Sequence, residues 1–131
     1  LHPTRSGTAW LFRNLLVADA AAFGRAEREA LVDYLWISAR ATARVMAAAL
    51  RRFTGVLGQR EVLTEAELAA VRQPALVLWG ERDRFVPLSH GERAARLLPH
   101  ASLHIIRGAG HSPNWERAEE VTQRVRAFLT E

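Results

Sequence analysis

Hydrophobic positions follow two different patterns along the chain, and the pattern changes near residue 60. Residues 8–53 are rich in Ala, Arg and Leu, and apolar side chains recur there at roughly helical spacing, as at Leu31, Leu35, Val45 and Phe53. We therefore predict a helical first half. Its expected boundaries are Ser6-Gly7 and the stretch from Asp19 to Gly24, and Thr54-Gly55 is expected to end the helical pattern.

The aromatic side chains of this half have two possible roles. They could line an apolar cavity, but aromatic residues at such spacings more often belong to a core. The residues concerned are Trp10, Phe12, Phe23, Tyr34, Trp36 and Phe53.

After residue 60, predicted helices alternate with predicted strands. Thr64–Glu67 has the form of a capping box and predicts a short helix as far as Val71. The continuous apolar run Ala75–Trp79 is typical of a strand that is buried on both faces of a parallel sheet. A second capping box is predicted at Ser89–Glu92, at the start of a helix that Pro99 ends. The order so far is helix, strand, helix.

The last third of the chain predicts one more strand and one more helix. Residues 102–106 alternate in a way that indicates a strand, and Glu116–Leu129 has an amphipathic helical pattern. The side chains expected to face inward from this helix are Val121, Val125, Phe128 and Leu129. Two strands that are joined by a crossover helix are normally parallel, so their carboxyl ends should meet at one edge of a sheet.

A carboxylate and a histidine follow these two strands. Asp83 comes shortly after the first strand, and His111 comes shortly after the second. The edge beyond the carboxyl ends of parallel strands is where α/β sheets place their chemistry, so we expect an acid–base pair there. Glu81 is a rival for the acid, and each residue by itself could simply belong to a turn. No such partner is expected for the other histidines, which are His2, His90, His100 and His104.

Composition limits the classes of function. With 131 residues and 49% hydrophobic content, the chain can form one domain with a core. Its 18 basic side chains are scattered among 14 acidic ones, which indicates solvated helix faces and no nucleic-acid partner. The absence of cysteine excludes disulfides, and no apolar run reaches the roughly 20 residues that a membrane span needs. We expect a soluble, cytoplasmic protein without a cofactor, a metal ion or a membrane contact.

The motifs around both candidate residues resemble a known family. The run Leu68–Pro87, followed by Gly108–Pro113 and the closing helix, looks like the C-terminal part of an α/β-hydrolase. The resemblance implies an α/β fold with parallel strands and a crossover helix. It further implies a helical cap or lid over residues 1–60, followed by the C-terminal part of the hydrolase core over residues 61–131. It assigns Asp83 and His111 as the acid and the base of a catalytic triad.

The third member of such a triad is not found in the sequence. In this family the nucleophile precedes the acid and normally lies in a Gly-x-Ser-x-Gly elbow. None of the five serines has glycines at that spacing, and the chain opens Leu1-His2-Pro3, with Met46 as its only methionine. We therefore expect the nucleophile to lie upstream in a longer protein. The N-terminal half of the same hydrolase, or another copy of the chain, is then needed to complete the sheet.

The resemblance leaves the reaction open. The run Arg82–Pro87 and Trp115 are similar to hydrolases of meta-cleavage products and to related esterases, but those hydrolases usually carry tryptophan where Ser112 stands. We predict cleavage of ester-type bonds in small apolar acyl substrates. An aspartate nucleophile would instead imply an epoxide hydrolase or a dehalogenase. A non-catalytic protein that binds a ligand or a partner is the other alternative, and an upstream elbow serine would argue against it.

We predict that the 131-residue chain alone does not hydrolyse esters, since it lacks both the nucleophile and the elbow amide that helps to form the oxyanion hole. The purified chain should release p-nitrophenol from a p-nitrophenyl ester no faster than its His111→Ala variant. Turnover above that control would contradict the prediction.

Overall fold

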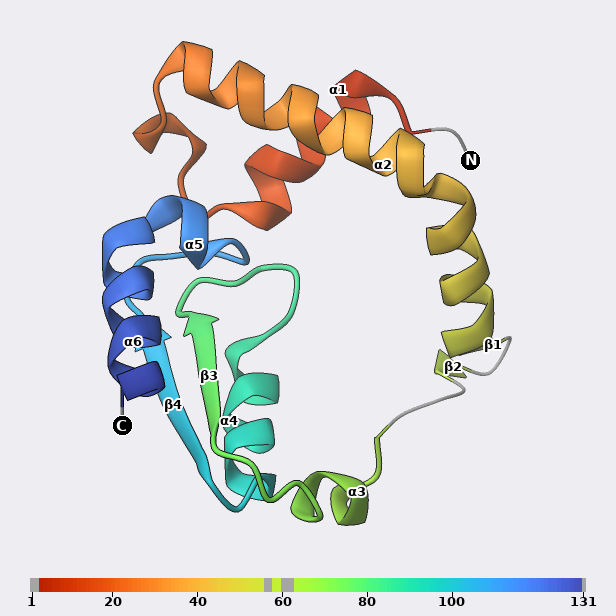
Figure 1. The fold of residues 1–131 in the computed structure, drawn as a ribbon. Helices are drawn as coiled ribbons and strands as arrows, with labels where there is room; N and C mark the ends of the chain where they lie inside the picture. Colours follow the sequence, from red (N-terminus) through yellow and green to blue (C-terminus); the bar gives the residue numbers. More distant parts are fainter. Residues whose placement is uncertain (1–2, 56–57, 60–62, 131) are drawn as a thin grey trace.

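The chain forms a helical first half and an α/β second half. The computed structural model describes residues 3–55, 58–59 and 63–130 (Figure 1). The helices are α1 (Arg5–Leu11), a π-helical turn (Phe12–Leu16), a 3-10 turn (Ala20–Ala22), α2 (Arg25–Phe53), α3 (Glu65–Ala69), α4 (Leu88–Leu97), α5 (Pro113–Glu116) and α6 (Ala118–Thr130). The strands are β1 (Thr54–Gly55), β2 (Gly58–Gln59), β3 (Ala75–Gly80) and β4 (Ala101–Ile106).

The two longer strands form the expected parallel pair. β3 and β4 pair in parallel from Ala75 opposite Ala101 to Gly80 opposite Ile106. The crossover helix α4 packs against both strands, and α6 contacts β3. Gly91 allows α4 to approach closely, because a Cβ atom at this position would lie 2.6 Å from the ring of Trp79. The parallel arrangement predicted from the sequence is confirmed, and both strands end at the same edge.

A small apolar core joins the helical half to the second half. Its buried side chains are Phe12, Val17, Phe23 and Val32. The rings of Phe12 and Phe23 meet edge to face with their centroids 5.7 Å apart. Trp115, from α5, packs against the same cluster, so this core holds the N-terminal helices close to the end of β4. Of the six aromatic residues considered above, Trp10 and Tyr34 are exposed, and the side chain of Phe53 lies outside the described residues.

Two glycines let the backbone after β4 cross the end of β3. A Cβ atom on Gly80 would lie 1.9 Å from the carbonyl oxygen of Gly110, and a Cβ atom on Gly110 would lie 2.6 Å from the amide nitrogen of Ala18. Only hydrogen fits at either position. The end of β3, the loop after β4 and residues 17–18 are therefore in direct contact.

The capping box at the start of α3 is confirmed. The Thr64 hydroxyl accepts a hydrogen bond from the Glu67 amide at 3.2 Å, and the Glu67 carboxylate accepts one from the Thr64 amide at 2.7 Å. The bonds from the Thr64 backbone and side chain hold the pKa of Glu67 below its ordinary value. The second capping box is wrong, because α4 starts one residue before Ser89. Pro87 occupies the N-cap position, and no side chain caps this helix.

Four further expectations are wrong in detail. Ser6-Gly7 is no boundary, since Thr4 caps α1 and both residues lie inside the helix. The closing helix is divided at Arg117, whose φ of −142° lies outside the helical region. Residues 75–79 are only half-buried. Of the side chains expected to face inward from the closing helix, Val125 and Leu129 are exposed. A pair of two strands cannot cover every apolar position that the pattern assigns to a buried sheet.

No helix within the described part of the chain combines the length and the apolar character that spanning a bilayer requires.

We predict that Gly80→Ala destabilises the protein by about 3 kcal/mol, because the new methyl group must displace the backbone around Gly110. Urea unfolding should detect this change as a lower midpoint. Gly24→Ala is the matched control, since no atom lies within 4 Å of its added Cβ, and it should lower the free energy of unfolding by less than about 1 kcal/mol. Equal losses in both variants would contradict the prediction.

Candidate active site

Asp83 is held by the loop that follows β3. One carboxylate oxygen, Oδ1, accepts hydrogen bonds from the backbone amides of Phe85 and Val86, both at 2.8 Å. The side chain of Asp83 is only 4% exposed. The indole Nε1 of Trp79 donates to the Val86 carbonyl at 3.1 Å and so ties this loop back to the strand. The second carboxylate oxygen, Oδ2, remains directed at the loop after β4.

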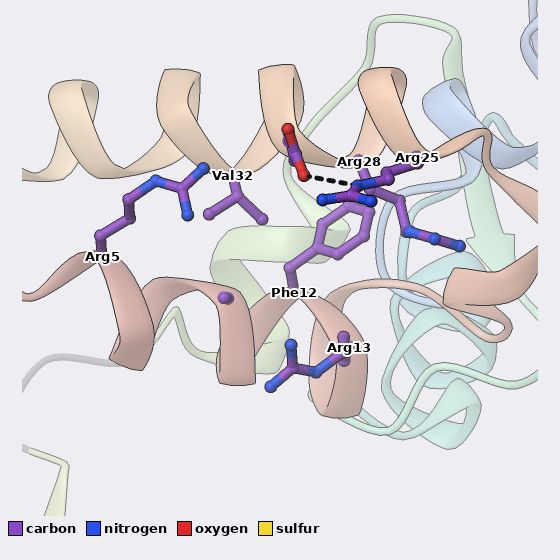
Figure 2. A pocket seen from close by; sticks show the side chains of 8 residues that line it. Arg5, Phe12, Arg13, Arg25, Arg28 and Val32 are labelled. Carbon is purple, nitrogen blue, oxygen red and sulfur yellow. Dashed lines mark hydrogen bonds and ion pairs between the residues drawn. The ribbon is translucent and has the colours of Figure 1, made fainter.

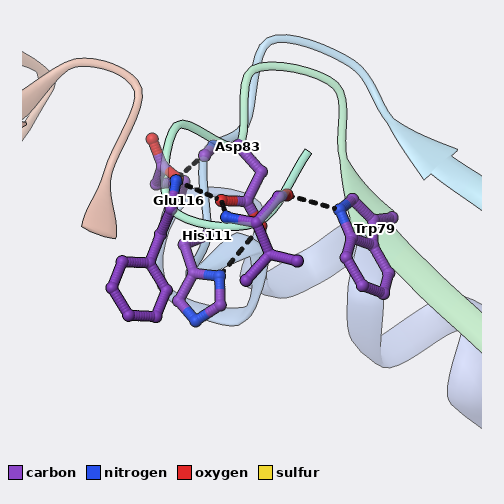
Figure 3. Close-up of polar contacts among 7 residues, drawn as sticks. Trp79, Asp83, His111 and Glu116 are labelled. Carbon is purple, nitrogen blue, oxygen red and sulfur yellow. Dashed lines mark hydrogen bonds and ion pairs between the residues drawn. The ribbon is translucent and has the colours of Figure 1, made fainter. Parts of the chain in front are cut away.

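His111 forms a hydrogen bond with this oxygen. Its Nδ1 lies 2.8 Å from Oδ2 of Asp83, and the ring of Phe85 meets the imidazole edge to face at 4.8 Å between centroids (Figure 3). A carboxylate can only accept, so Nδ1 carries the proton and the lone pair of a neutral ring lies on Nε2. The imidazole is 34% exposed, and Nε2 has no hydrogen-bond partner among the described residues. This arrangement leaves Nε2 able to take up a proton.

Glu81 occupies a different position. Its Oε2 accepts a hydrogen bond at 2.9 Å from the amide of Gly108, which has a φ of +68°. The structure therefore places Asp83, and not Glu81, beside His111. The sequence could not separate these two carboxylates by spacing alone, because both follow β3 by a few residues.

One of the other histidines has a carboxylate partner, which the sequence did not predict. Nε2 of His104 lies 3.0 Å from Oε1 of Glu120, so the expectation that His104 has no such partner is wrong. The two residues come from β4 and α6, and only the packing of that helix brings them together. His90 and His100 are exposed, as expected, and His2 lies outside the described residues.

Glu116 is a charged residue of this region to which the sequence analysis gave no role. Its two carboxylate oxygens accept hydrogen bonds from the amides of Ala18 and Gly110, each at 2.6 Å. Ala18 precedes Glu116 by 98 residues, so no local pattern could have indicated this contact.

Two pockets lie away from the Asp83–His111 pair. A pocket of about 300 Å³ between α1 and α2 has arginines on its walls, namely Arg5, Arg13, Arg25 and Arg28 (Figure 2). Asp33 raises the pKa of Arg5 by accepting a hydrogen bond from it and by its charge. A second pocket, of about 430 Å³, lies where the two halves of the chain meet and includes Arg82 and Trp115. Neither lining contains Asp83 or His111.

Within the described ranges, no group of three or more His, Cys, Asp and Glu side chains is placed to hold a metal ion.

Known proteins resemble this chain in sequence and in fold. A 2-hydroxy-6-oxononadienedioate/2-hydroxy-6-oxononatrienedioate hydrolase from Dechloromonas aromatica is 46% identical over 63 residues, which are 48% of this chain and 22% of that protein. The crystal structure of an esterase from a Rhodococcus species matches 97% of the chain and 42% of its own length, with 27% identity and a TM-score of 0.73. The chain thus spans less than half of either relative.

A further solved structure supports the fold over nearly the whole chain. The 2-hydroxy-6-oxo-6-phenylhexa-2,4-dienoate hydrolase of another Rhodococcus strain matches 98% of this chain and 45% of its own, with a TM-score of 0.77 at 22% identity. The sequence model of the alpha/beta hydrolase family matches residues 3–124, which include the helical half as well as both strands. With its two parallel strands delivering a carboxylate and a histidine to one edge, the chain belongs to the alpha/beta hydrolase family.

Proposed function

We propose that this chain supplies the acid and the base of a hydrolytic triad, with Asp83 as the acid and His111 as the base. The observation that supports this most strongly is the hydrogen bond of 2.8 Å from Nδ1 of His111 to a buried carboxylate, which leaves Nε2 free among the described residues. Asp83 would fix the tautomer of the ring and stabilise the imidazolium that forms when Nε2 takes a proton.

The nucleophile would come from a segment that precedes these residues in the complete protein. In the first step His111 would take the proton of a serine hydroxyl while the serine oxygen attacks the acyl carbon. His111 would then give that proton to the leaving group. In the second step His111 would activate water against the acyl-enzyme. With an aspartate nucleophile the substrate would instead be an epoxide or a haloalkane, from which the halide leaves, and His111 would act only in the second step.

Ester-type bonds of small apolar acyl substrates are the proposed target. The esterase of known structure supports this class, with 27% identity across almost the whole chain. Ser112 also favours it, because the hydrolases of meta-cleavage products usually carry tryptophan directly after the histidine. The Ser112 side chain is buried, and its amide donates to the Leu16 carbonyl at 2.9 Å.

Hydrolysis of a carbon–carbon bond is the second candidate. It is favoured by the curated relatives, which are named hydrolases of 2-hydroxy-6-oxononadienedioate and 2-hydroxy-6-oxononatrienedioate and of which one is 46% identical over 63 residues. The mechanism would keep Asp83 and His111 in the same roles.

A protein that contains the upstream segment separates the two candidates. We expect it to hydrolyse p-nitrophenyl butyrate with a higher kcat/KM than a 2-hydroxy-6-oxo-dienoic acid, whose loss of absorbance reports cleavage. The opposite order would favour carbon–carbon hydrolysis. If neither compound is turned over and a fluorophosphonate does not label the protein, the proposed hydrolysis by a serine nucleophile is wrong. Turnover of an epoxide or a haloalkane would then indicate an aspartate nucleophile, and no turnover of these either would indicate that the family fold serves binding here.

In the same protein, Asp83→Asn and His111→Ala should each lower kcat by a factor on the order of 10³ to 10⁴, because the base loses its orientation in one variant and is absent in the other. Glu81→Gln is the matched control, since it changes a carboxylate of the same loop that binds Gly108 and not His111. It should retain kcat within about tenfold. An equal loss in Glu81→Gln and Asp83→Asn would contradict the assignment of the acid.

A further inference from the structure

One carboxylate connects the loop that carries His111 to the first half of the chain. The side chain of Glu116 lies beside the Asp83–His111 pair (Figure 3). Its Oε2 accepts from the amide of Gly110, directly before His111, and its Oε1 accepts from the amide of Ala18, both at 2.6 Å. Both bonds are partly buried, and a hydrogen bond to an ionised group is roughly twice as strong as a neutral one. Glu116 therefore holds two segments that are remote from each other in the sequence.

The residue after His111 is tied to the same segment. The amide of Ser112 donates to the carbonyl of Leu16 at 2.9 Å. Gly110 lies directly against the backbone of residues 17–18, where only a hydrogen atom fits. The backbone on both sides of His111 is thus attached to residues 16–18, and Glu116 provides the charged part of that attachment.

The position of this backbone decides whether the imidazole reaches Asp83. The bond between His111 and Asp83 is 2.8 Å long, so a displacement of the loop by about 1 Å away from Asp83 would take the pair beyond hydrogen-bonding distance. Asp83 cannot follow, because its Oδ1 is held by two amides of its own loop.

We propose that Glu116 is a positioning residue, which keeps His111 aligned with Asp83 for as long as residues 16–18 are docked on the histidine loop. This positioning role of Glu116 rests on the proposed function, in which His111 is the base. A carboxylate suits it because two amide donors require two acceptor oxygens. Glutamine offers one oxygen, and its NH₂ group would face the other amide without an acceptor between them.

The alignment can be measured without turnover. A histidine Nδ1 proton that is bonded to a carboxylate gives a resonance downfield of the amides, and its exchange with solvent reports local opening. We expect the resonance of His111 in the wild-type protein and in the control Glu119→Gln, whose carboxylate is exposed on α6. In Glu116→Gln the proton should exchange at least about tenfold faster, or the resonance should be lost.

Folding of the variants must be separated from alignment. Circular dichroism and the urea midpoint check that Glu116→Gln is folded. If it is not, Glu116→Asp keeps the charge on a side chain too short to span both amides, and should show the same faster exchange. Loss of the fold in both variants, or exchange equal to that of Glu119→Gln in a folded variant, would overturn the proposal.

Kinetics of the protein with its upstream segment give the second measurement. In Glu116→Gln we expect kcat to fall by about tenfold or more with KM nearly unchanged, because misalignment affects the proton transfer rather than binding. Unchanged kcat would overturn the positioning role. If the wild-type protein with its upstream segment shows the resonance of the His111 Nδ1 proton but hydrolyses no substrate, the proposed function fails. The exchange measurement then still decides whether Glu116 aligns His111 with Asp83.

Discussion

The close approach of Gly80 to the backbone of Gly110 is the constraint on which the candidate site depends. The parallel pairing ends with Gly80 opposite Ile106, and the chain then turns so sharply that the Gly110 carbonyl occupies the space of a Cβ atom on Gly80. Each strand is followed within a few residues by one member of the pair. The crossing therefore brings Nδ1 of His111 to 2.8 Å from Oδ2 of Asp83, although the two residues come from separate loops.

Backbone amides donate hydrogen bonds to the carboxylates that gather around this crossing. Asp83 accepts from two amides and from His111, Glu81 accepts from the Gly108 amide, and Glu116 accepts from the amides of Gly110 and Ala18. Unpaired carboxylates in a partly buried region would be costly, whereas carboxylates with amide donors stabilise the loops that supply those donors. The same contacts that fold the loops also fix the geometry in which His111 could act as a base.

Much of the second half could be predicted from local patterns, and the errors have a common cause. The strand over Ala75–Trp79 and the box formed by Thr64 and Glu67 depend on neighbours in the sequence, and the parallel order follows from the crossover helix. All three are confirmed, although β3 is only half-buried. The inward positions assigned to α6 are wrong for Val125 and Leu129, because a helix pattern shows which residues share a face and not how much sheet lies beneath it. The partner of His104 was missed because it lies on another element.

The sequence by itself determined the helix-strand-helix-strand-helix order of the second half, the family resemblance, and the position of an acid and a histidine just beyond two parallel strands. Those features follow from residue spacing within a few turns, where chain geometry alone relates the side chains. Only the tertiary structure decided that His111 contacts Asp83 while Glu81 binds Gly108, and that Glu116 binds an amide 98 residues away. A hydrogen bond requires atoms to approach within about 3 Å, and for residues so far apart along the chain that distance is set by how the elements pack.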